Sequence, residues 1–233
     1  MPTRTWENLD PGRRERVLVA AMAEFGRHGY SGGSLNVIAR EAGVAKGSLF
    51  QYFADKSDMY AHVAERAALR VYADLAELAV QPEGVPLPEH LVDALCAWVA
   101  YFASHPLERA ITIATNLERD PSAREAIRVP INRIYVEAIG PMLMAARERG
   151  ELRTGIDLDP VIATVVLLLQ HLAMAPFTPG LDPILDLYGA APSVVRDRIT
   201  RWVSTFWSGV GAPGVSGVAA PNAVRDGHRD DTG

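Results

Sequence analysis

Cysteine is almost absent from this chain of 233 residues, which contains only Cys96. One thiol excludes an internal disulfide and any metal site built from several thiolates. Histidine is sparse as well, and the six side chains form no H-x-x-x-H pair or other zinc spacing. We therefore expect no metal, no cofactor and a reducing compartment, the cytoplasm.

Long hydrophobic runs are lacking too. The most apolar stretch, Val161 to Leu169, is under half the roughly 20 residues that a membrane-spanning helix requires. The first 14 residues, MPTRTWENLDPGRR, contain no apolar core of a secretory signal. The sequence thus predicts a soluble protein with no membrane partner.

Signatures of catalysis are few. The G-x-G-x-x-G string at 209–214 follows an expected helix rather than a strand, so we expect no dinucleotide site there. The Lys46-Gly47-Ser48 triplet lacks the glycine loop of a phosphate-binding motif, and residue order reveals no Ser-His-Asp arrangement. We expect that the protein is not an enzyme.

Hydrophobic residues make up 48% of the chain, enough to bury a core. The net charge of −5 is unevenly divided. Residues 1–56 hold eight Lys or Arg and six Asp or Glu, a net charge of +2, so the remainder carries −7. A positive N-terminal part on an acidic body is compatible with one face that meets phosphates.

The sequence SLNVIAREAGVAKGSLFQYF, residues 34–53, predicts a helix-turn-helix. Two short helical patterns, 35–42 and 46–53, are separated by Gly43, which can adopt the positive φ that ends one helix. One edge of the second pattern carries short or hydrogen-bonding groups and a single positive charge, as a major-groove edge would. A helical hairpin with a solvated face is the alternative.

Residues 13–60 resemble the DNA-binding domain of the tetracycline-repressor (TetR) family in three successive segments: AAMAEFGRHGY (20–30), SLNVIAREAGVAKGSLFQYF (34–53) and DKSDMY (55–60). The chain departs from the family pattern at Ala45, where Ser or Thr often caps the helix, at Phe50, where Tyr is usual, and at Gln51-Tyr52, where an aromatic followed by His is frequent. The missing cap is expected to cost about 1 kcal/mol of local stability. The resemblance implies contacts with bases or phosphates from Ser34, Arg40, Lys46, Gly47, Ser48, Gln51, Tyr52 and Lys56.

Helical patterns continue through the rest of the chain, and no strand pattern is present. We expect an all-α protein with an N-terminal three-helix helix-turn-helix domain and a C-terminal helical ligand-binding and dimerisation domain. The predicted division is a flexible arm (1–9), the DNA-binding domain (10–55), the second domain (56–208) and a disordered tail (209–233). Pro130 and Gly140-Pro141 should kink or divide the helix that contains them.

The family likeness implies a cavity in the second domain. Candidates for its apolar wall and its polar groups are Trp98, Tyr101, Phe102, Tyr135, Met142 and Phe177, with Thr112, Asn116 and His171. Ordinary core packing is the alternative for each of them. The helices over 159–175 and 193–208 resemble the pair that forms a four-helix dimer bundle in the family. The predicted interface comprises Val161, Val165, Leu168, Leu172, Val195, Ile199, Trp202, Val203 and Phe206.

These features predict a homodimeric, ligand-responsive transcriptional regulator. Its partners would be a pseudo-palindromic double-stranded DNA operator and a small, mostly apolar effector that releases a repressor from DNA. Two alternatives are a DNA-binding regulator of the same fold without an effector, and a helical carrier or enzyme whose N-terminal domain no longer binds DNA.

Overall fold

The computed structural model describes residues 2–215 and confirms the all-α class. That part of the chain contains no β-strand, only an isolated bridge between Leu152 and Gly211. The ten α-helices within it are α1 (Arg4–Glu7), α2 (Pro11–Gly32), α3 (Leu35–Ala42), α4 (Lys46–Tyr52), α5 (Lys56–Asp74), α6 (Leu87–Ser104), α7 (Pro106–Asn116), α8 (Pro121–Glu148), α9 (Leu158–Leu172) and α10 (Pro192–Val210). Two 3₁₀ turns, Ala76–Ala79 and Ala175–Phe177, complete the set.

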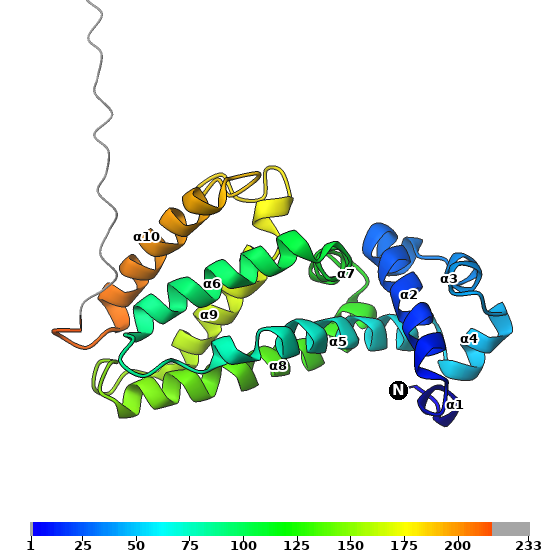
Figure 1. Cartoon of the computed structure of the whole chain (residues 1–233), viewed down its shortest axis with the longest axis horizontal. Helices are drawn as coiled ribbons and strands as arrows, with labels where there is room; N and C mark the ends of the chain where they lie inside the picture. The colour runs from blue at the N-terminus through cyan, green and yellow to red at the C-terminus, as the bar shows by residue number, and fades with distance from the viewer. Residues whose placement is uncertain (1, 216–233) are drawn as a thin grey trace, which may run out of the picture.

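The molecule is elongated, with α1 to α4 gathered at one end (Figure 1). Phe25 of α2, Ile38 of α3 and Leu49 of α4 are at most 2% exposed and form the centre of this N-terminal domain. α5 leaves the domain and lies along α8 in the larger body (Figure 1). It is therefore a continuous connection between the two parts.

The expectation of a flexible arm over residues 1–9 is wrong for the residues that the structure describes. Thr3 caps α1, and the Trp6 side chain is only 2% exposed. The Trp6 ring packs on Phe53, with 4.8 Å between the ring centroids, and lies 5.6 Å from the His62 ring. The segment is thus part of the N-terminal domain.

A close joint connects the N-terminal domain to the body. A Cβ added to Gly26 of α2 would lie 2.8 Å from the Cβ of Ala110 in α7, so the two helices approach as closely as glycine permits. Next to this contact, the buried carboxylate of Glu118 accepts a hydrogen bond from the backbone N–H of Tyr30 at 3.1 Å. The first contact joins α2 to α7, and the second joins α2 to the connection between α7 and α8.

α8 is one continuous helix of 28 residues, although it contains Pro130 and Pro141. The alternative in which the prolines divide the helix is therefore excluded. α10 also extends past its predicted end to Val210, and the following residues pack back on the body, where Ala212 N–H donates to the Glu151 carbonyl at 2.8 Å. The predicted disordered tail is wrong for 209–215, and its remainder lies outside the described residues.

The stretch Leu158–Phe177 is long and apolar enough to cross a membrane by length and composition, with a mean hydropathy of 1.8. This finding differs from the expectation that the longest apolar stretch is too short. Half of the stretch is buried inside the protein, and the core helix of a soluble protein passes the same test. The α-helix itself ends at Leu172, before Pro176.

The prediction of which sides of α9 and α10 form the dimer interface is wrong. The helices bury that side against their own chain, leaving 0–8% exposure for Val161, Val165, Leu168, Leu172, Val195, Ile199 and Val203. Only Trp202 and Phe206 of the predicted set lie partly at the surface, where their rings stack with centroids 5.1 Å apart. In α9 the exposed apolar residue is instead Leu167, at 65%.

Candidate nucleic-acid interface

The turn between α3 and α4 follows the geometry that its sequence predicts. Gly43 ends α3 in the left-handed region, with φ 67° and ψ 38°, and its N–H bonds back to the carbonyls of the helix. Ala45, at the N-cap of α4, makes no side-chain capping bond, as expected from the departure at this position. The start of α4 therefore depends on packing by Leu49, which is 2% exposed.

The outer face of α4 is small and polar at its N-terminal end. Lys46, Gly47 and Gln51 are exposed, and Ser48 is half-buried between them. A Cβ added to Gly47 would meet no atom within 4 Å, so packing inside the chain does not explain the glycine. The free backbone N–H groups of this first turn also favour a negatively charged partner.

Tyr52 does not belong to this face, contrary to the prediction. Its side chain is 3% exposed, and the ring centroid lies 5.8 Å from that of Trp6. Tyr52 follows Leu49 by three residues, which places both on the buried side of the helix. The exposed aromatic of α4 is Phe50, at 51%, which the sequence analysis did not assign to the site.

The remaining three residues of the predicted DNA-binding set, Ser34, Arg40 and Lys56, lie outside α4 and flank it. Arg40 is exposed on α3 and pairs with Glu41 at 2.9 Å, and half-buried Ser34 accepts a capping bond from Val37 N–H at 3.5 Å. Lys56, at the start of α5, donates to the Ser31 carbonyl at 3.2 Å. Its ammonium also lies 5.1 Å from the centroid of the Tyr30 ring. Lys56 is thus positioned by contacts with Tyr30 and Ser31 near the end of α2, whereas Arg40 pairs with its exposed neighbour Glu41.

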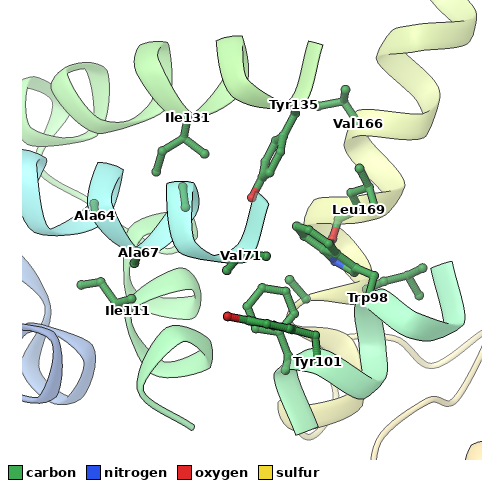
Figure 2. Packing of buried hydrophobic residues seen from close by; sticks show 14 of the residues in the cluster. Ala64, Ala67, Val71, Trp98, Tyr101, Ile111, Ile131, Tyr135, Val166 and Leu169 are labelled. Atoms are coloured by element: carbon green, nitrogen blue, oxygen red, sulfur yellow. The ribbon is translucent and has the colours of Figure 1, made fainter. Parts of the chain in front are cut away.

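A first cavity lies in the body, between α5, α6, α8 and α9. It encloses about 680 Å³ of empty space including its open mouth, and all its lining residues are aliphatic or aromatic. Three of the predicted pocket residues, Trp98, Tyr135 and Met142, line it. Figure 2 shows the Tyr135 ring pointing from α8 toward α5, and the Trp98 indole nitrogen donates to the Leu169 carbonyl of α9 at 2.8 Å.

Four predicted pocket residues lie elsewhere. Tyr101 stacks on His105 and its hydroxyl donates to Asp74, and Phe102 is fully buried in the core. His171 Nε2 lies 2.9 Å from Asp182, and the Phe177 ring lies under the Arg109 guanidinium. For these residues the expectation of a place in the pocket wall is wrong, because each has a partner within the chain.

A second, smaller cavity adjoins the first. It encloses about 240 Å³ including its opening, and Thr112 and Asn116 of α7 line it as the predicted polar groups. Tyr135 lines both cavities, as does Ala68 of α5. Arg128 of α8 also lines the second cavity and was missed by the sequence analysis, because an isolated arginine in a long helix has no pattern that separates it from surface charge.

The segment with the helix-turn-helix also matches a known family. Residues 17–63, which contain α3, the turn at Gly43 and α4, match the profile described as "Bacterial regulatory proteins, tetR family". The chain carries a TetR-family DNA-binding domain. It is accordingly a DNA-binding transcriptional regulator, and α3 and α4 are the two helices of its helix-turn-helix.

Two curated relatives of this chain are transcriptional repressors. The HTH-type transcriptional repressor AcnR of Corynebacterium diphtheriae is 25% identical over 180 residues, which cover 75% of this chain and 88% of AcnR. The repressor SCO4008 of Streptomyces coelicolor is 35% identical over 94 residues, 40% of this chain and 44% of that protein.

Solved structures extend the likeness of the fold beyond the DNA-binding domain. SmeT in its triclosan complex superposes with a TM-score of 0.66 at 20% identity, covering 91% of this chain and 98% of SmeT. A TetR-family regulator from Chloroflexus aurantiacus superposes with a TM-score of 0.61 at 20% identity. The match covers 91% of this chain and 99% of that regulator. At these identities the match concerns the fold alone.

Proposed function

We propose that this chain is a ligand-responsive repressor of the TetR family that binds a pseudo-palindromic operator as a homodimer and is released by a small, mostly apolar effector. The observation that carries the DNA-binding part is the face of α4. It exposes a glycine, a lysine and a glutamine beside a helix N-terminus, on a helix anchored from behind by Leu49.

In this proposal the exposed residues of α4 read the DNA and their neighbours fix its position. Gln51 and Ser48 would contact base edges, and Lys46 bases or phosphates. Lys56, Arg40 and Ser34 would contact the backbone without reading sequence. Because Tyr52 is buried, we assign its expected role at the surface to Phe50, whose exposed ring can contact a thymine methyl group or a sugar.

We infer that the dimer forms through the exposed sides of α9 and α10. Leu167 of α9 is 65% exposed and Val194 of α10 is 38% exposed, and the stacked Trp202 and Phe206 lie partly at the surface. Large apolar side chains at the surface mark an interaction site when they occur together. A two-fold pair of this kind would place two recognition helices about 34 Å apart, one turn of DNA.

The cavity supports the effector part of the proposal. α5 begins at the DNA-binding domain with Lys56, and its second half lines the first cavity through Ala68 and Val71. A molecule that fits one position of α5 better than another would shift the spacing of the recognition helices. Only that difference in affinity can change operator binding, and about 1–3 kcal/mol of coupling gives five- to 150-fold derepression.

The proposed domain division follows from these roles. The DNA-binding domain comprises the helix-turn-helix over 10–55 together with the N-terminal segment that packs on it. Residues 56–208 would form the ligand-binding and dimerisation domain, to which we add the last residues of α10, a helix that ends at Val210.

Gel shifts at several salt concentrations test the DNA-binding part, with DNA from upstream of the protein's own gene. Gln51→Ala is expected to change the preference among operator variants. Lys56→Ala should instead weaken binding to all of them alike and reduce the salt slope by about 1. Arg133→Ala, an exposed position of α8, is the control. Equal effects of the Gln51 and Lys56 variants would contradict the division of roles.

A further inference from the structure

Arg128 of α8 carries a charge that its own chain leaves incompletely paired. Its Nη2 donates to the Asn132 side-chain oxygen at 2.7 Å, but the buried Nη1 has no hydrogen-bond partner among the described residues. No carboxylate within residues 2–215 forms an ion pair with this guanidinium. Burial lowers the pKa of Arg128, as expected for a cation withdrawn from water.

A buried cationic donor without an acceptor is costly, so its persistence calls for a partner. The second cavity, which Arg128 lines, offers space for one beside the polar side chains of Thr112, Thr115 and Asn116. Thr115 and Asn116 already donate to the Thr112 carbonyl, at 3.0 and 2.9 Å. Arg128 is therefore the charged group in this cavity whose hydrogen-bonding capacity is left for a ligand.

The two cavities adjoin each other, one lined mostly by polar and the other by apolar side chains. Tyr135 and Ala68 line both, so the polar space around Arg128 opens beside the apolar space around Trp98 and Met142. Figure 2 shows Tyr135 between Ile131, which lines the polar cavity, and Leu169, which lines the apolar one. A ligand that fills both spaces must be charged or polar at one end only.

We propose that the effector is an amphipathic carboxylate whose anionic head binds Arg128 Nη1 in the small cavity and whose apolar chain or ring occupies the large one. This inference rests on the proposed function, since it names the chemical class of the effector. A carboxylate supplies the acceptor oxygens that a guanidinium lacks here, and it is planar and small enough for the narrow space. A neutral alcohol could fill the same volume but would leave the charge of Arg128 uncompensated.

Calorimetric titrations of the full-length protein, without DNA, test the proposal. The probes are decanoate, 1-decanol and decyltrimethylammonium, which share one apolar chain and differ in the charge of the head. Decanoate is expected to bind at least about tenfold more tightly than 1-decanol, because its carboxylate forms an ion pair with Arg128, whereas the alcohol offers only a neutral acceptor. The cationic probe should bind more weakly than either.

Arg128→Gln should remove the preference for decanoate while leaving 1-decanol binding nearly unchanged. Arg133→Gln, the loss of an exposed arginine in the same helix, should retain the preference. If Arg128→Gln does not fold, the ratio of the affinities of the natural protein for decanoate and 1-decanol still tests the proposal. Equal affinities for these two probes, no binding of decanoate, or a preference that survives in Arg128→Gln would each overturn the proposal.

The titrations test the carboxylate site independently of the proposed DNA-binding function, because they contain no DNA. A chain that prefers decanoate but shifts no operator would contradict the repressor and leave the carboxylate site standing. A protein that shifts operator DNA but binds decanoate and 1-decanol equally would contradict the carboxylate site and leave the repressor standing.

Discussion

The hydroxyl of Thr3 donates to the carbonyl oxygen of Gln51 across 2.5 Å, joining residues 48 positions apart. The backbone N–H of Thr3 also donates, at 2.9 Å, to the carbonyl of Tyr52. Both acceptors lie in the last turn of α4, where carbonyls have no partner within the helix. The N-terminal segment thus supplies hydrogen-bond donors to the last turn of α4. Trp6 holds this segment in place by packing on Phe53.

Trp6→Ala should reduce the free energy of unfolding by about 3 kcal/mol, the scale of removing a large buried aromatic side chain. It should also weaken DNA binding, because α4 loses the segment that supports its end. Urea denaturation measures the first effect and fluorescence anisotropy with operator DNA the second. Thr5→Ala, the exposed neighbour, is the control, and a Trp6 variant as stable as that control would contradict the packing role.

Gly47→Ala should separate folding from DNA binding. The new Cβ meets no atom within 4 Å, so alanine is accommodated and its higher helix propensity should add about 0.5–1 kcal/mol of stability. If DNA approaches the backbone of α4 at Gly47, the same methyl group should weaken operator binding. Thermal unfolding and gel shifts on the two proteins are the measurements. A variant that is more stable and binds DNA unchanged would exclude close approach at this position.

The stability of the N-terminal domain should fall in mildly acidic solution because of His62. Burial, with Arg66 adding to its effect, lowers the pKa of His62 to about 4, against about 6.5 in an unfolded chain. Between these values the unfolded state binds a proton that the folded state excludes, so the free energy of unfolding decreases as the pH falls from 6.5 to 4. Urea denaturation at pH 5.0 and 7.5 measures the decrease.

His62→Gln should show a smaller decrease over the same interval. His28→Gln is the matched control, since the His28 side chain is 47% exposed. If the natural protein and His62→Gln lose the same stability between pH 7.5 and 5.0, burial of His62 is not the cause of the acid sensitivity.

Leu167→Glu should shift the protein from dimer to monomer and reduce operator affinity with it. Leu167 is 65% exposed in the single chain, so the change is expected to cost little in folding while burying a charge in the proposed interface. Sedimentation equilibrium gives the mass. Val80→Glu, at a residue 70% exposed outside the proposed interface, should remain dimeric. Dimers in both variants would place the interface elsewhere.

The sequence was most informative where a residue type has a local role. Asp10 and Asp55 cap α2 and α5, and Gly43 adopts the left-handed conformation that its position requires. Each of these roles depends on the backbone within four residues, which the sequence displays directly. The helix-turn-helix and the all-α class therefore followed from the sequence.

The errors concern residues whose partners are distant in the chain. Trp6 has no periodic neighbours, and its contacts lie 47 and 56 residues further on, at Phe53 and His62. α9 is apolar on most of its circumference, so its sequence does not reveal which side faces its own chain and which leaves Leu167 exposed. Arg128 became a candidate only when the fold placed it beside Thr112 and Asn116.

The most direct test of the central claim is selection of bound sequences from a random pool of double-stranded DNA by the full-length protein, followed by sequencing. The account predicts enrichment of a pseudo-palindrome whose half-sites lie one helical turn apart, about 10 base pairs between centres. Gln51→Ala should change the enriched bases within both half-sites equally. Enrichment of a single unrepeated half-site, or no enrichment at all, would contradict a dimer that reads DNA with the exposed face of α4.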